Sequence, residues 1–319
     1  MMLEGKKKAW ILNDHRIGNI NQLRSIAFYL DDHLEFLEKE IIFDCKITLP
    51  NFLHFFIKNP GNIKKFQNCD KPDFIFSAGR RSALAAIKLK KIYPHSKIIQ
   101  IMRPNINAKY FDFISTPIHD NYNYADYESL IAPNLINESR LIKETEKFPA
   151  IAKSKFLVLI GGSSKAKKID DYMASDFYEF IDKISKIYQC EFSFVTSRRT
   201  DKNIQEIIKN NFQFSKKYFF EKIKDNNPYL ALINKAENII VTGDSVSMIS
   251  DCLATGKPCI VYEKFASAKH LKMIKNLKNN NLIKLSANIG DSDFTSYKYK
   301  KINEAKKIAE EIITKFSLQ

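Results

Sequence analysis

The chain has 319 residues, a length that suits two domains of about 150 residues better than one. Its hydrophobic content of 45% is ordinary for a globular protein, and no run approaches the ~18 apolar residues that a membrane span requires. The formal net charge of +15 leaves nucleic acid, an anionic membrane and anionic substrates as possible partners.

The first half of the chain alternates short apolar strands with amphipathic helices. It begins with MMLEGKKKAWIL, which lacks the apolar core of a signal peptide and favours a cytoplasmic protein. Strands are expected over residues 9–12, 41–43, 73–77, 97–102 and 111–115, helices over 20–30 and 82–91, and an apolar segment of ambiguous type over 53–57.

A charged stretch bracketed by Pro133, Asn134 and Pro149 interrupts this rhythm, and we place the domain boundary there. The expected domains are residues 1–135 and 150–300, followed by a helix within 301–319. The second half repeats the first scheme, with strands over 156–160, 191–196, 217–220, 238–241, 258–261 and 282–285, and helices over 169–188, 201–209, 228–236, 246–255, 269–277 and 301–315.

Alternating strands and helices predict an α/β protein with open, doubly wound parallel sheets, in which ligands bind at the carboxyl ends of the strands. Residues suited to tight turns and anion binding gather at these ends. Glycine is scarce, with nine in the chain, yet six of them follow a strand or end a helix beside one: Gly18, Gly79, Gly161, Gly162, Gly243 and Gly256. Four of the eight arginines form two pairs just after strands, Arg80-Arg81 and Arg198-Arg199.

The helix over 246–255 has two distinct faces. Val246, Ile249 and Leu253 form an apolar stripe, and Asp251 falls on the opposite side. The free N–H groups at its start suit a phosphate, and Asp251 lies about 6 Å further along the axis, within reach of a ribose. The alternative is an ordinary N-cap at Asp244 or Ser245 and a solvated Asp251.

Six loop segments, ordered along residues 9–262, resemble those of one known family. The segments are DHRIGNINQ (14–22), AGRRS (78–82), PIHD (117–120), IGGSSK (160–165), TSRRT (196–200) and TGDSVSMISDCLATG (242–256). They are similar to the mitochondrial-fission "elongated mitochondria" family of plants and bacteria, which itself resembles the GT-B glycosyltransferase superfamily and, in style, the peptidoglycan N-acetylglucosaminyltransferase.

This resemblance implies two Rossmann-like domains facing a cleft, with a nucleotide-sugar donor bound mainly by the second domain. It also implies transfer without a metal or cofactor, and a C-terminal helix that packs back on the first domain. In such enzymes a helix N-terminus holds the diphosphate and an acidic residue holds the ribose. Asp244, Ser245, Ser247, Met248 and Asp251 match that pattern, although the superfamily commonly has Glu where this chain has the shorter Asp251.

Helix dipoles and basic groups must then stabilise the departing nucleoside diphosphate. Backbone N–H groups of Gly161, Gly162, Ser163 and Ser164 are candidates, with a simple tight turn as the alternative. The segment Ser197, Arg198, Arg199 and Thr200 offers bidentate phosphate contacts, with a structural ion pair as the alternative.

The first domain would hold the acceptor. Arg16, Gly18, Asn19, Gln22, Gly79, Arg80 and Arg81 are the acceptor-side candidates, although Asn19 and Gln22 could simply cap their helix. Inverting transfer needs a general base, for which the candidates are Asp14, His15, His119 and Asp120. The five cysteines show no metal-ligand spacing, so no metal site is expected.

The leading hypothesis is a GT-B glycosyltransferase that moves a sugar from a nucleotide donor to a cell-envelope lipid or glycan. The alternative is a non-catalytic adaptor at the inner face of the cytoplasmic membrane, where Lys6–Lys8, Lys264–Lys278 and Lys298–Lys301 would meet anionic lipid. Nucleic acid is not an expected partner, because no reader motif or aromatic platform is present.

Overall fold

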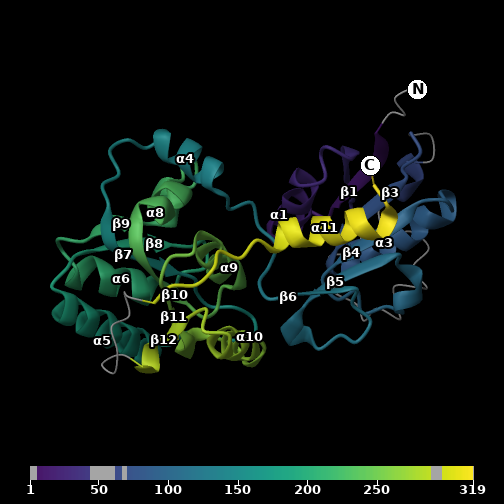
Figure 1. The fold of residues 1–319 in the computed structure, drawn as a ribbon. Helices are drawn as coiled ribbons and strands as arrows, with labels where there is room; N and C mark the ends of the chain where they lie inside the picture. Colours follow the sequence, from purple (N-terminus) through teal and green to yellow (C-terminus); the bar gives the residue numbers. More distant parts are fainter. Residues whose placement is uncertain (1–5, 44–61, 67–69, 289–296, 319) are drawn as a thin grey trace. The chain divides into compact units, whose positions relative to one another are not determined.

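The computed structural model describes residues 6–43, 62–66, 70–288 and 297–318. The chain forms two compact units, Met1–Leu135 together with Asn303–Gln319, and Ile136–Ile302 (Figure 1). The apolar segment expected over 53–57 lies outside the described residues.

The first unit is built around a six-stranded sheet in which every strand pairs in parallel, in the order β2-β1-β3-β4-β5-β6. The strands are β1 (Lys7–Asn13), β2 (Leu34–Glu40), β3 (Phe74–Ala78), β4 (Lys97–Ile101), β5 (Phe113–Pro117) and β6 (Tyr127–Ser129). The helices are α1 (Ile17–Phe28), α3 (Gly79–Ile92) and α11 (Glu304–Phe316), with short 3-10 turns η1 (Ile63–Phe66), η2 (Ala108–Tyr110) and η3 (Ile118–Asp120).

Both faces of this sheet are covered, as its alternating side chains require. Ala9 and Ile11 of β1 pack into a core with α1 and α11, whereas Trp10 and Leu12 pack into a second core with α3. The strand is therefore apolar throughout, which is typical of a parallel sheet buried on both sides.

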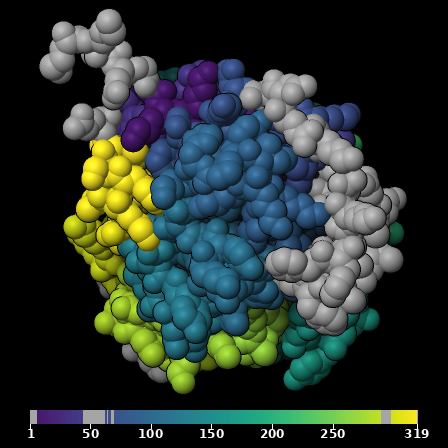
Figure 2. Space-filling model, turned by 90° about the vertical axis from the view of Figure 1, so that its right-hand side faces the viewer, coloured from purple at the N-terminus to yellow at the C-terminus, as the bar shows by residue number. Residues whose placement is uncertain are grey.

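The last helix of the chain, α11, belongs to this first unit. Ile308 and Ile312 lie in the core shared with α1, and the Tyr127 hydroxyl donates to the buried Glu304 carboxylate at 2.6 Å. Figure 2 shows these yellow C-terminal residues against the purple and blue surface of the N-terminal residues.

The second unit contains another all-parallel sheet, in the order β12-β11-β10-β7-β8-β9. Its strands are β7 (Ser154–Ile160), β8 (Phe192–Thr196), β9 (Lys216–Tyr218), β10 (Ala236–Thr242), β11 (Cys259–Tyr262) and β12 (Lys284–Leu285). Its helices are α4 (Glu138–Glu146), α5 (Asp171–Tyr188), α6 (Lys202–Asn211), α7 (Phe220–Ile223), α8 (Tyr229–Lys235), α9 (Val246–Thr255) and α10 (Ala268–Asn279), with 3-10 turns η4 (Glu263–Phe265) and η5 (Ser286–Asn288).

The sequence prediction of doubly wound parallel sheets is confirmed, and several of its details are wrong. The second strand is Leu34–Glu40 instead of 41–43. It was overlooked because it is an edge strand with one solvent-exposed face, so its apolar residues alternate with charged ones. The three-residue β6 was missed, and the charged stretch near the expected boundary contains the helix α4. The strand expected over 217–220 ends at Tyr218, and the short helix α7 begins at Phe220.

Each sheet has one point where the winding direction reverses. In the first unit the chain moves from β1 to β2 and then returns to the other side of β1 with β3. In the second unit it moves from β7 through β8 and β9 and then returns beside β7 with β10. The loops that follow the two strands at such a switch point diverge, and open α/β sheets bind ligands there. Within the described ranges, no helix is both long and apolar enough to cross a membrane.

Candidate functional site

Three loops meet at the carboxyl ends of β7, β8 and β10 in the second unit, and the Asp244 side chain joins them. Its carboxylate is buried and accepts from the Gly162 N–H at 2.8 Å, from the Thr242 hydroxyl at 2.7 Å and from Arg199 Nη2 at 3.1 Å. Burial raises the pKa of Asp244 above its ordinary value, against the lowering effects of the Gly162 N–H and the Arg199 guanidinium. We call Asp244, Arg199 and Gly162 the loop clamp.

The glycine–serine loop after β7 uses its backbone donors within the protein. Gly161 donates to Thr242 Oγ1, Ser163 to Asp201 Oδ2 and Ser164 to the Lys167 carbonyl, each at 2.8 Å, and Gly162 donates to Asp244. This corrects the sequence-based expectation for Gly161, Gly162, Ser163 and Ser164, whose four N–H groups are not free to receive an anion. They hold the loop in place instead.

Close packing of the neighbouring loops leaves no room for a side chain at Gly161 or Gly162. A Cβ at Gly161 would lie 2.0 Å from Asp244 Oδ2, and one at Gly162 would lie 1.8 Å from the Arg199 backbone oxygen. Ser197 Oγ and Thr200 Oγ1 both donate to the Gly161 carbonyl, so the loop after β8 is tied to the same point. Any side chain at Gly162 would separate these loops.

The N-terminus of α9 keeps free donors. Ser245 is the N-cap and accepts from the Met248 N–H at 3.5 Å, while the N–H groups of Val246 and Ser247 have no acceptor among the described residues. Ser247 is exposed. Arg198 is also exposed, and no ion pair of its side chain is found in the described part of the chain. Arg199 is paired with Asp244, so the anion-binding candidates at this site are the N–H groups of Val246 and Ser247 and the Arg198 side chain.

His270 on α10 joins this site and was missed from the sequence, where a lone histidine in a lysine-rich segment gives no signal. Its Nδ1 is buried and has no hydrogen-bond partner among the residues that the structure describes. Burial lowers the pKa of His270, against the raising effects of Asp244 and the Gly243 carbonyl. The imidazole is therefore neutral near pH 7.

Asp251, expected to face a ribose, contacts a neighbouring helix. Its Oδ2 accepts from the Tyr229 hydroxyl of α8 at 3.0 Å, and burial raises the pKa of Asp251 to about 7. It is thus not the solvated charge of the alternative reading. Its contact with a ribose stays a prediction.

At the switch point of the first unit, Asn19 joins the loops that follow β1 and β3. Its Nδ2 donates to the buried Asp14 carboxylate and to the Ala78 carbonyl, both at 3.1 Å. Gly79 follows directly with a φ of 76°, a left-handed conformation that favours glycine. Asp14 also accepts from the Arg16 N–H at 3.2 Å, so its carboxylate shapes the loop.

The other acceptor-side candidates, Gln22, Arg80 and Arg81, differ in their contacts and exposure. Gln22 donates to the Gly18 carbonyl at 3.2 Å, within its own helix. The Arg81 guanidinium lies over the Phe43 ring at 4.6 Å, whereas Arg80 is exposed, with no ion pair among the residues described.

The four candidate bases differ in how far their side chains are exposed to solvent. The side chains of His119 and Asp120 are 5% and 10% exposed, with 3.9 Å between Nε2 and Oδ1. The His15 side chain is 55% exposed, and its Nε2 lies 2.9 Å from Glu40 Oε1 at the end of β2. A carboxylate that orients an accessible imidazole is a common arrangement for a general base. Glu40 was not predicted, because it lies in the strand that the sequence analysis misplaced.

The described residues contain no group of three or more His, Cys, Asp or Glu side chains that could hold a metal ion.

Comparison with known proteins identifies relatives along most of the chain. Residues 18–316 match the family model described as Mitochondrial fission ELM1. The Rickettsia prowazekii protein named Uncharacterized protein RP120 is 32% identical, with 97% of this chain and 98% of that protein covered. Mitochondrial fission protein ELM1 of Arabidopsis thaliana is 21% identical over 76% of this chain, which spans only 64% of that longer relative.

Solved structures with the same fold include sugar-nucleotide enzymes. The UDP-GlcNAc 2-epimerase from Neisseria meningitidis bound to UDP-GlcNAc has a TM-score of 0.59 at 13% identity, covering 98% of this chain and all of the other. The epimerase from Methanocaldococcus jannaschii has a TM-score of 0.54 at 15% identity and the same coverage. The glycosyltransferase of kitacinnamycin has a TM-score of 0.55 at 11% identity, covering 98% and 94%. The shared fold is GT-B, with two Rossmann-like domains.

Proposed function

The chain belongs to the mitochondrial fission ELM1 family, and on this premise we propose that it is a GT-B glycosyltransferase. It takes a sugar from a nucleotide-sugar donor held by the second unit and passes it to a cell-envelope lipid or glycan.

One observation carries the proposal: the switch point of the second unit keeps free positive groups. The N–H groups of Val246 and Ser247 and the exposed Arg198 suit a diphosphate, because a helix N-terminus and a guanidinium both favour negative charge. The loop clamp also contains the carboxylate of Asp244. Arg199 forms an ion pair with it at 3.1 Å, which reduces its electrostatic repulsion of a bound diphosphate.

The relatives suggest which nucleotide to try first. Two of the three fold neighbours named above are UDP-GlcNAc 2-epimerases, and the Neisseria meningitidis structure was solved with UDP-GlcNAc bound. UDP-GlcNAc is therefore the first donor to test. The reaction products distinguish the two activities. Sugar transfer releases free UDP, whereas epimerisation yields a sugar that is still bonded to UDP.

The base on the first unit is His15, oriented by Glu40. It is the one candidate of the four with a mostly exposed side chain. Asp14 is committed to Asn19 and shapes the loop.

The test is a thermal-shift scan of the full chain against UDP, GDP, ADP, CMP and their common sugar conjugates. One nucleotide should raise the melting temperature by several degrees. Arg198→Ala should weaken its binding about tenfold, since a charge-assisted hydrogen bond contributes roughly 1.5–3 kcal/mol. Lys209→Ala, which removes an exposed cation at the far end of α6, is the matched control. Absence of any shift, or equal effects of the two variants, contradicts the proposal.

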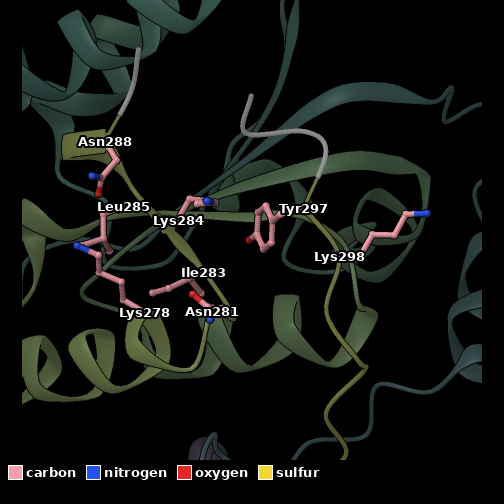
Figure 3. A pocket seen from close by; sticks show the side chains of 8 residues that line it. All are labelled: Lys278, Asn281, Ile283, Lys284, Leu285, Asn288, Tyr297 and Lys298. Atoms are coloured by element: carbon pink, nitrogen blue, oxygen red, sulfur yellow. The ribbon is translucent and has the colours of Figure 1, made fainter. Parts of the chain in front are cut away.

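A second candidate function, adaptor at an anionic membrane surface, is favoured by the lysines of α10. Exposed lysines recur every three residues along this helix, at Lys269, Lys272, Lys275 and Lys278. At its end lies a cavity of about 380 Å³ whose described lining contains three lysines and no acidic residue. Figure 3 shows Lys284 beside the Tyr297 ring, Lys278 across the cavity and Lys298 extending outward.

Vesicle binding separates this candidate from a purely enzymatic role. Each lysine near an anionic bilayer contributes about 1 kcal/mol, so the double variant Lys272→Glu and Lys275→Glu should abolish binding to phosphatidylserine vesicles at low salt. The control is Lys202→Glu with Lys209→Glu on α6, which makes the same charge change elsewhere. Equal binding by both double variants would exclude an α10 membrane face.

A further inference from the structure

The first unit has a cavity of about 870 Å³ beside the carboxyl ends of β4 and β5. By strand order it lies on the far side of β3 from β1, so it is separate from the Asp14–Asn19 loop. The loop after β4 and the segment after β5 line it with polar and aromatic side chains: Arg103, Asn105, Asn107, Lys109, Tyr122 and Tyr124. None of the motifs in the sequence analysis included these residues.

The cavity is positively charged. Arg103 and Lys109 both line it, and its described lining contains no carboxylate. The Arg103 guanidinium lies over the Tyr122 ring, 5.3 Å from its centre. A guanidinium stacked in this way keeps its N–H edge available, in the planar geometry that suits a phosphate or a carboxylate.

Two tyrosines give the cavity an aromatic wall. The rings of Tyr122 and Tyr124 are 5.7 Å apart at 67°, and Tyr124 is 70% exposed. An exposed aromatic ring among amide side chains is suited to a saccharide, because the C–H face of a sugar packs on the ring while its hydroxyls pair with amides. Asn105 and Asn107 provide such amides.

The loop after β4 is held in shape from beneath. The buried Gln100 amide donates to the Met102 carbonyl at 2.9 Å, and the Met102 N–H donates to the Ser115 carbonyl at 2.8 Å. Met102 and Asn105 have φ values of 68° and 54°, which are uncommon for residues with side chains. Asn107 Oδ1 accepts from the Lys109 N–H at 3.0 Å and fixes the start of η2. Such support is typical of a preorganised binding loop.

We propose that this cavity binds a saccharide that carries an anionic group. The proposal stands on the lining of the cavity alone and does not depend on the proposed transferase activity.

The experiment measures binding to the full chain by isothermal titration calorimetry with four probes: glucose 6-phosphate, glucuronate, glucose and inorganic phosphate. The two anionic sugars should bind at least tenfold more tightly than glucose or phosphate alone. Arg103→Ala should reduce their affinity to that of glucose, and Tyr124→Ala should weaken binding of all three sugars. Tyr172→Ala, which removes an 82% exposed tyrosine from α5, is the matched control and should change nothing.

Melting temperatures of the variants check that each one folds. Phosphate binding as tightly as the anionic sugars would reduce the cavity to an anion site and overturn the proposal. So would glucose binding equally well, or wild-type affinity in both Arg103→Ala and Tyr124→Ala. The same samples are titrated with the nucleotide found in the thermal-shift scan. Nucleotide binding without sugar binding overturns this inference alone, whereas sugar binding without nucleotide binding overturns the proposed transferase.

Discussion

At the scale of single residues, the loop clamp depends on partners that are far apart in sequence. Asp244 accepts from Gly162, which lies 82 positions away, and from Arg199, which lies 45 positions away. The adjacent pair Gly161-Gly162 directly after an apolar strand located this loop in the sequence, because glycine is scarce in this chain and suits a tight turn. The partners of its N–H groups could not be predicted, since they depend on how the strands are ordered in the sheet.

Gly162→Ala should destabilise the second unit by about 2–4 kcal/mol, because its Cβ would overlap the Arg199 backbone oxygen. Gly18→Ala is the control, since a Cβ there meets nothing within 4 Å and alanine is the better helix former by roughly 0.5–1 kcal/mol. Urea unfolding measures both. Equal stability of the two variants would show that the loops can separate at little cost.

At the scale of elements, buried parallel strands could be predicted because they are continuous apolar runs, as in FLVLI of β7. Two strands and two helices were missed for physical reasons. β2 is an edge strand with alternating charges and β6 has three residues. α4 is a nine-residue helix with one buried residue, and α7 has four residues, none of them buried. Their stability comes from tertiary pairing, which leaves little trace in a local pattern.

The contact between α8 and α9 makes a pH-dependence testable. The pKa of Asp251 is about 7 in the folded chain against an ordinary 3.8, so the folded state holds the extra proton between these values. Stability should fall as pH rises from about 4 to about 7 and stay level above that. Asp251→Asn can still accept from Tyr229 and should remove this fall, which at ~1.4 kcal/mol per pKa unit is about 4 kcal/mol from pH 4 to pH 8, of which about 2.5 kcal/mol lies between pH 5 and pH 8.

Urea unfolding at pH 5 and pH 8 measures the difference, with Asp225→Asn, an exposed loop residue, as the control. An Asp251→Asn variant with the same pH profile as the parent would show that this carboxyl titrates normally.

At the scale of the whole molecule, each sheet carries its own polar link across a switch point, Asn19 in the first unit and Asp244 in the second. Open α/β sheets bind ligands at these points, and the loops after β1, β3, β7 and β10 that the sequence analysis singled out lie there. The charge of +15 gave less guidance, since it suits a nucleotide, an anionic sugar and a membrane alike.

The most direct test of the central claim is a crystal structure of the full chain with UDP. The account predicts diphosphate oxygens about 3 Å from the Val246 and Ser247 nitrogens, with Arg198 turned toward them. UDP bound at another place, or a saturated crystal without UDP at the start of α9, would contradict it.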